Sequence, residues 1–269
     1  MFKYGIVALS LAFLATLAHA DGDYISPTDD RVRLSLGVMH VSSSTNLQVD
    51  SSKGIPGTDI NAENEFGLDK SDFEPKFQAM VRVNERNRLW FDYFTLDRTG
   101  NTTVTEPIVF RDSVLQVGNP LQSQLNLRML GITYGYSFWH SEKLEFAATL
   151  EITSVDIAAN AKVQTEAYHV NQNEDQAGPF PTPGLAATWV LSKRFYFDAR
   201  AQYLDVHVHN LEGSLGFLDV DVLYRFRPNV SFALGYDKVK ASLSSTQATS
   251  GGFFDFNAGG PEFFVRVSF

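Results

Sequence analysis

The sequence predicts an all-β protein, an antiparallel up-and-down transmembrane β-barrel of about ten strands, with eight strands as the alternative. Apolar and polar residues alternate along segments of about ten residues, the length that a tilted strand needs to cross a bilayer. Short turns alternate with long polar loops between these segments. No apolar run after residue 20 reaches the roughly 20 residues that a membrane-spanning helix needs. We therefore expect a single barrel domain over residues 21–269.

The first 20 residues have the pattern of a secretory signal peptide. Lys3 provides the positive charge, an apolar run covers residues 6–17, and Ala18 and Ala20 are the small residues before the expected cleavage site. A retained membrane anchor is the alternative, but the acidic sequence from Asp21 ends the apolar run too early for a membrane span. We expect an exported protein that begins at Asp21.

Ten segments carry the alternation, and a closed single-chain barrel of this type needs an even number of strands. We expect short turns at residues 84–87, 139–142, 192–194 and 227–228, and long loops at residues 50–73, 99–121, 156–181, 207–215 and 240–260. This asymmetry predicts a periplasmic side with the short turns and both termini, and an outer side with the long loops. The expected strands are residues 31–48, 74–83, 88–98, 122–138, 143–155, 182–191, 195–206, 216–226, 229–239 and 261–269.

One face of these strands is predicted to contact lipid. In residues 216–226, Leu218, Val220 and Val222 alternate with Asp219 and Asp221. A soluble sandwich would bury the apolar face and expose the acids, whereas a membrane barrel does the opposite. Aromatic residues beside the expected short turns, such as those at positions 138, 139, 195, 197, 224 and 226, favour the barrel because they are typical of a membrane interface.

The C-terminal residues carry a resemblance to a known family. Apolar residues alternate up to a terminal aromatic residue at Phe263, Val265, Val267 and Phe269. This segment resembles the last strand of bacterial outer-membrane β-barrel proteins. The resemblance implies a small barrel in the bacterial cell outer membrane, surrounded by lipid and lipopolysaccharide. It also implies that these four residues are the signal that the barrel assembly machinery recognises.

The alternate positions of the strands predict a charged interior with six cations and eight anions. Barrels of about eight strands are filled by side chains, and open channels belong to barrels of about 16 to 18 strands. We therefore expect a network of ion pairs that fills the lumen, with a narrow channel or a path for a small solute as the alternative. The predicted network consists of Arg33, Lys76, Arg82, Asp92, Glu145, Glu151, Asp198, Arg200, Asp219, Asp221, Arg225, Asp237, Glu262 and Arg266.

Composition excludes several classes of function. The formal net charge is −9, and without Lys3 the mature chain has 21 cations against 31 anions, or −10. Its Lys and Arg residues form no basic cluster, so nucleic acid is not an expected partner. The chain has no cysteine, which excludes disulfides and thiolate sites. We assign no cofactor and no metal ligands, and we expect a monomer.

Catalysis is a minor alternative. His207 and His209 lie two residues apart at the expected outer end of a strand, with Asp205 nearby. Some ten-stranded outer-membrane barrels are surface proteases that act through aspartate and histidine at the extracellular rim, and these three residues with Asp97 loosely resemble that arrangement. The longer motifs of those proteases are absent. A structural or surface-interaction role is therefore the leading hypothesis, transport the first alternative, and an outer-membrane hydrolase at the extracellular rim the second.

Overall fold

The computed structural model describes residues 25–110, 112–163, 177–246 and 251–269. The expected signal peptide, residues 1–20, lies outside the described residues. Within these ranges, no helix is long and apolar enough to cross a membrane.

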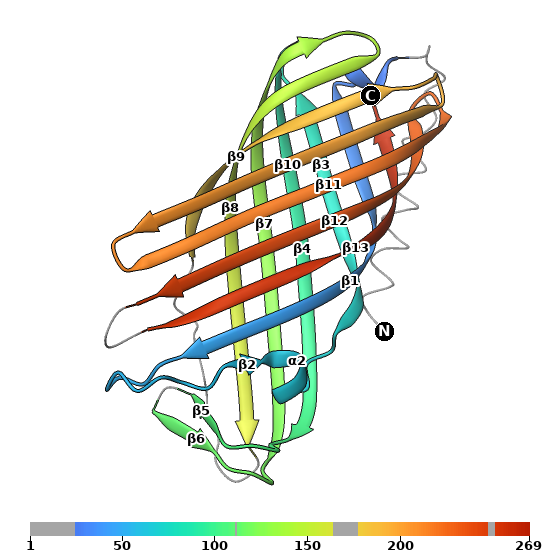
Figure 1. Ribbon diagram of the computed structural model, residues 1–269. Helices are drawn as coiled ribbons and strands as arrows, with labels where there is room; N and C mark the ends of the chain where they lie inside the picture. Colours follow the sequence, from blue (N-terminus) through green and yellow to red (C-terminus); the bar gives the residue numbers. More distant parts are fainter. Residues whose placement is uncertain (1–24, 111, 164–176, 247–250) are drawn as a thin grey trace.

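Ten antiparallel strands form a closed ring (Figure 1). Each strand pairs with its neighbours along the chain, and the last strand closes the ring by pairing with the first, for example through Leu36 and Val265. The expected number of strands and the up-and-down order are confirmed. In order round the ring the strands are β1 (Val32–Val49), β3 (Ser71–Arg82), β4 (Asn87–Thr103), β7 (Pro120–His140), β8 (Leu144–Val163), β9 (Ala177–Val190), β10 (Phe195–Val208), β11 (Leu211–Arg227), β12 (Val230–Ser245) and β13 (Gly252–Ser268).

Short turns join the strands at one end of the barrel, which we call the turn end. They lie at residues 83–86, 141–143, 191–194 and 228–229, as the sequence predicts. The C-terminus lies at the same end, because the carbonyl oxygen of Phe269 accepts hydrogen bonds from the backbone N–H groups of Arg31 and Val32. In Figure 1 the turn end is at the top.

Two of the expected long loops pack together at the opposite end, which we call the loop end. Residues 50–70 contain the short strand β2 (Ile60–Asn61) and one turn of helix, α2 (Ala62–Glu65). Residues 104–119 contain a small hairpin of β5 (Ile108–Phe110) and β6 (Ser113–Leu115). A buried apolar cluster joins the two segments through Ile60, Val104, Ile108, Leu115 and Leu121. This cluster orders the loop end of the barrel.

Two other expected long loops, at residues 207–215 and 240–260, are wrong. Strands β10 and β11 continue until only His209 and Asn210 connect them, and His209 adopts a positive φ of 54°. Strand β12 likewise stays paired with β13 along its length, from Val230 opposite Val267 to Ser245 opposite Gly252. Backbone hydrogen bonds hold a strand whether its side chains are polar or apolar, so the strands continue beyond the apolar region that the sequence analysis recognised.

The barrel is inverted relative to a soluble protein. Large apolar side chains are exposed on its outer face, with Leu185 61% and Leu234 67% accessible. Charged side chains face inward, and Glu145 is fully buried. The outward positions predicted for Leu218, Val220 and Val222 are confirmed, each about 40% accessible. An exterior of this kind fits contact with lipid.

Candidate functional site

The interior of the barrel holds the charged side chains in layers, and the first layer is at the turn end. Glu145 of β8 accepts two hydrogen bonds from the guanidinium group of Arg82 on β3, at 3.0 and 2.8 Å. The guanidinium group of Arg88 lies 2.9 Å from the same carboxylate, and the Ser137 hydroxyl donates to it at 2.5 Å. Two strands separate β3 from β8, so these side chains reach across the lumen.

The segment before β1 closes this end. Its short helix η1 (Pro27–Asp29) packs inside the barrel, where Arg33 donates to the carbonyl of Pro27 and Arg225 to the carbonyl of Ile25. Asp30 is buried between the same two guanidinium groups, 3.3 Å from Arg33 and 3.2 Å from Arg225. Burial raises the pKa of Asp30, although the two arginines act in the opposite direction. The turn end is therefore filled by the protein's own chain.

A second layer crosses the middle of the barrel. Asp198 accepts hydrogen bonds from Thr188 at 2.8 Å, from Arg33 at 3.1 Å and from Arg266. The second centre of the layer is Lys76, whose ammonium group lies 2.6 Å from Asp237, 2.8 Å from Glu262 and 3.5 Å from Asp219. The third is Arg200, which lies 2.7 Å from Asp92 on the opposite wall. Small cavities remain beside these ion pairs, and one of them is lined by Arg33, Asp198 and Arg266.

All fourteen residues predicted to face inward do so. Each except Glu151 has an ion pair within the described part of the chain. Glu151 instead accepts hydrogen bonds from Thr133 at 3.1 Å and Thr153 at 2.7 Å.

Five buried charged residues were not predicted: Asp30, Glu63, Glu74, Arg88 and Arg98. Arg88 and Arg98 have the same strand parity as Asp92, so the alternation along β4 identifies them. Arg98 forms a buried ion pair with Glu63 of α2 and donates to the Thr45 hydroxyl at 2.9 Å. No alternation marks Asp30 or Glu63, because both lie outside the long strands.

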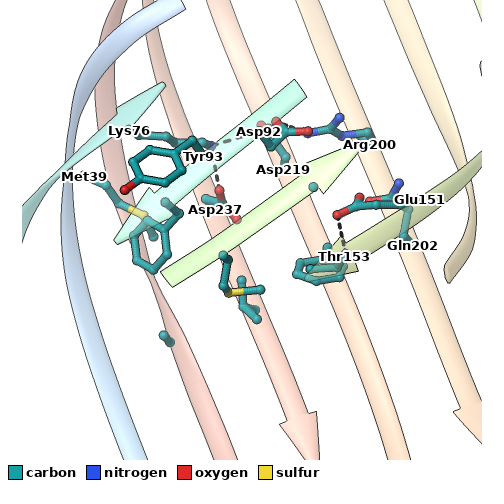
Figure 2. A pocket seen from close by; sticks show the side chains of 16 residues that line it. Met39, Lys76, Asp92, Tyr93, Glu151, Thr153, Arg200, Gln202, Asp219 and Asp237 are labelled. Atoms are coloured by element: carbon teal, nitrogen blue, oxygen red, sulfur yellow. Dashed lines mark hydrogen bonds and ion pairs between the residues drawn. The ribbon is translucent and has the colours of Figure 1, made fainter. Parts of the chain in front are cut away.

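Between the charged layers and the loop end, the lumen is lined by apolar side chains. A buried cluster contains Met39, Leu96, Leu127, Met129 and Phe256. Between this cluster and the charged layer lies a cavity of about 70 Å³ (Figure 2). Its apolar wall includes Met39, Phe94, Met129 and Phe217, and its charged floor consists of Lys76, Asp92, Arg200, Asp219 and Asp237.

Of the four candidate catalytic residues, only Asp205 and His207 are brought together. The Asp205 carboxylate lies 3.3 Å from His207 Nδ1 and accepts a hydrogen bond from the Tyr203 hydroxyl at 3.2 Å. Gln202 is buried in the lumen, so by alternation Asp205 and His207 lie on the outer face. His209 is in the turn beyond them. Asp97 is on β4, and three strands lie between β4 and β10 by the shorter way round the ring, so the four residues form no common site.

The four residues of the predicted assembly signal lie at the end of β13. Phe263 and Phe269 are exposed on the outer face, and Phe263 stacks against Phe232 with ring centroids 6.4 Å apart. Val267 has the same parity but is covered by its neighbours. Recognition of this strand by an assembly machinery stays a prediction.

Comparison with solved structures identifies the architecture. The outer-membrane protease OmpT from Escherichia coli superimposes with a TM-score of 0.56 and 9% identity, over 91% of this chain and 98% of that chain. The fold is that of a bacterial outer-membrane β-barrel. The toluene transporter TodX from P. putida matches with a TM-score of 0.35 and 10% identity, over 91% and 93% of the two chains. Neisserial surface protein A matches with a TM-score of 0.30 and 13% identity, over 88% and 97%. No protein-family model and no curated relative matches the sequence.

Proposed function

We propose that the protein is an exported, monomeric outer-membrane barrel that is closed to ions and acts at the cell surface through its loop end. The short turns then face the periplasm and the loop end faces outward. The observation that carries the closed lumen is the pair of charged layers, in which Glu145 and Asp198 each bind arginines from other walls of the barrel. Residues 25–30, which precede β1, add a plug at the turn end of the barrel.

The loop end supports a role in surface interaction. Its two ordered loops are held by the apolar cluster around Ile60 and by the buried pair of Arg98 and Glu63. An ordered surface loses less conformational entropy on binding than a flexible one. Exposed apolar side chains at Ile55, Val114 and Val117 offer contact area to a macromolecular partner.

Conductance in planar bilayers tests the closed barrel. The wild-type protein should give no steady ion conductance. Deletion of residues 25–30 combined with Glu145→Ala should produce measurable openings, because the variant lacks both the plug and the carboxylate at the centre of the first charged layer. Heat-dependent electrophoretic mobility of both proteins controls for barrel formation. A stable conductance of the wild-type barrel would refute this function.

The cavity favours a second candidate function, the binding of a small apolar molecule. An apolar wall above a charged floor suits a ligand with one polar group, which is the usual organisation of a small-molecule site. Met129→Trp should fill the cavity and abolish binding of a fluorescent apolar probe, whereas Leu234→Trp, on the outer face, should not. Equal probe binding by the two variants would place the probe on the outer surface and exclude this function. Because Asp97 lies apart from the exposed pair of Asp205 and His207, we do not propose hydrolysis.

A further inference from the structure

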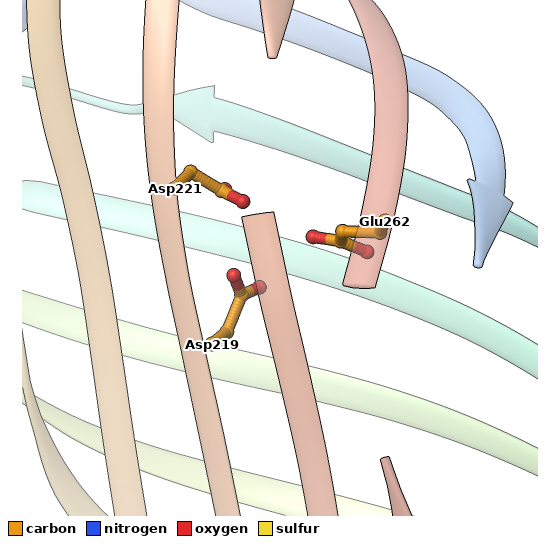
Figure 3. Close-up of side chains that lie close together, drawn as sticks. All are labelled: Asp219, Asp221 and Glu262. Carbon is orange, nitrogen blue, oxygen red and sulfur yellow. The ribbon is translucent and has the colours of Figure 1, made fainter. Parts of the chain in front are cut away.

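Two acidic side chains meet above a glycine inside the barrel. Asp221 of β11, Gly235 of β12 and Glu262 of β13 are directly opposite one another in the strand register. Since Gly235 has no side chain, the two carboxylates extend toward each other over its backbone. Asp219, two residues from Asp221, adds a third carboxylate (Figure 3). The three residues offer oxygen atoms that all lie within 4.8 Å of one another.

The carboxylate oxygens of Asp221 and Glu262 occupy the space that a side chain at position 235 would need. A Cβ atom at position 235 would overlap Asp221 Oδ1 and would lie 2.9 Å from Glu262 Oε1. A small cavity of about 10 Å³, enough for roughly one water molecule, adjoins the group and is lined by Asp219, Asp221 and Glu262. A single ion or water molecule therefore has room beside the three side chains.

Two of the oxygens lack the partners that burial demands. Asp221 and Glu262 are 2% and 4% accessible. Neither Asp221 Oδ1 nor Glu262 Oε1 has a hydrogen-bond donor among the described residues. The other oxygen of Asp221 is 3.7 Å from Arg266, a distance too long for a close ion pair, and Arg266 binds Asp198 more closely. Lys76 lies 2.8 Å from the other oxygen of Glu262 and 3.5 Å from Asp219, so it leaves these two oxygens without a partner. Buried carboxylate oxygens without donors are costly, which favours an additional positive group between them.

The charge of the surrounding layer points the same way. Four cations of the layer face six acids, a formal charge of −2, and one of those cations, Arg33, is shared with Asp30. Strand register also places acids directly opposite acids, Asp198 beside Asp221 and Asp219 beside Asp237, an unfavourable arrangement without compensation. The cations are Arg33, Lys76, Arg200 and Arg266, and the acids are Asp92, Asp198, Asp219, Asp221, Asp237 and Glu262.

We propose that Asp219, Asp221 and Glu262 bind one divalent cation of the Ca²⁺ or Mg²⁺ class inside the barrel. All three ligands are carboxylate oxygens, which are the preferred ligands of these ions. One divalent ion offsets the excess of two acids among these ion-paired residues. Its structural effect is to tie β11 to β13 across β12 and so to strengthen the wall where the ring closes.

Titration of the folded protein in detergent tests the site. After treatment with EDTA, the wild-type protein should bind Ca²⁺ saturably in calorimetry, and bound Ca²⁺ should raise the temperature at which the heat-dependent mobility shift occurs. Asp221→Asn keeps the shape of the side chain and should lower the affinity at least about tenfold, because it removes a charged ligand. Glu151→Gln, which removes a buried lumen carboxylate outside the three, is the matched control and should bind as the wild type does.

Other outcomes would overturn the proposal. Equal Ca²⁺ binding by wild type and Asp221→Asn would place the ion elsewhere, such as on exposed loop carboxylates. Absence of binding, with a wild-type barrel that is stabilised by acid and an Asp221→Asn barrel that is not, would show that the carboxylates share a proton instead. If Asp221→Asn fails to fold, Glu262→Gln takes its place. Mn²⁺ electron paramagnetic resonance on the wild-type protein needs no variant. We expect a signal from bound Mn²⁺ that added Ca²⁺ removes. The absence of bound Mn²⁺ would refute the site.

Discussion

Arg33 on β1 and Asp198 on β10 form an ion pair of 3.1 Å across the inside of the barrel, although three strands separate them round the ring. Arg266 joins the same carboxylate from β13. Side chains that span the lumen in this way stiffen the wall. The interior therefore acts as the polar core of an inverted protein.

Removal of the central acid should destabilise the barrel strongly. Asp198→Ala leaves Arg33 and Arg266 buried without their shared carboxylate, and the free energy of unfolding should fall by about 3–5 kcal/mol. Urea unfolding of the protein in lipid vesicles measures this loss. Asp205→Ala removes an exposed carboxylate from the same strand and should change stability by less than about 0.5 kcal/mol. Equal effects of the two substitutions would contradict the network.

A methyl group at position 235 should be poorly tolerated. Gly235→Ala brings a Cβ atom into Asp221 Oδ1, so the free energy of unfolding should fall by about 1–3 kcal/mol. Gly216→Ala on β11 is the control, because its Cβ atom would meet no atom closer than 3.4 Å. Ca²⁺ should raise the mobility-shift temperature of Gly216→Ala but not that of Gly235→Ala. A Ca²⁺ response in both variants would show that cation binding does not depend on the glycine at position 235.

The plug at the turn end should respond to pH through Asp30. Burial raises the pKa of this carboxyl, so the folded state holds its proton more tightly than the unfolded state does. Its contribution to stability is fully present below the unfolded pKa of about 3.9 and is lost as pH rises through the folded pKa. Asp30→Asn should remove this part of the pH dependence. Urea unfolding across acidic pH measures it, and identical profiles for the two proteins would exclude Asp30 as the source.

The order of the loop end should depend on the pair of Arg98 and Glu63. Glu63→Gln leaves the buried guanidinium group without its carboxylate and should cost the packed loop about 3 kcal/mol, roughly a hundredfold in its opening equilibrium. Limited proteolysis within residues 50–70 should accelerate, while the heat-dependent mobility shift of the barrel stays unchanged. The exposed Asp59→Asn is the control. No difference in cleavage rate would show that the apolar cluster alone holds the loop.

The end of β13 should affect assembly in cells more than stability. Phe269→Ala removes an exposed terminal aromatic residue and should lower the heat-modifiable fraction in the outer membrane, while refolding of the purified protein in detergent continues. Phe232→Ala removes an outward aromatic residue of similar exposure from the wall of the barrel and serves as the control. Equal losses in cells would show that hydrophobicity, rather than the terminal position, is recognised.

The primary structure was sufficient to predict the number of strands, their order and the inward face of the fourteen charged residues assigned to the lumen. These properties are local, since a strand repeats every two residues and a short turn joins neighbours. The alternation of Leu218, Asp219, Val220 and Asp221 predicts its own orientation without reference to any other strand. The same rule extends to Arg88 and Arg98, which lie inward as their parity requires.

Only the tertiary structure decided which inward residues meet. The register between strands distant in the chain brings Asp221 and Glu262 together over Gly235 and places Arg33 beside Asp198. No periodic pattern in the sequence predicts that residues 25–30 fold into the lumen. None predicts that α2 packs onto the loop end either. Orientation follows from the geometry of a single strand, whereas contact depends on the stagger and closure of the whole ring, which no segment of about ten residues contains.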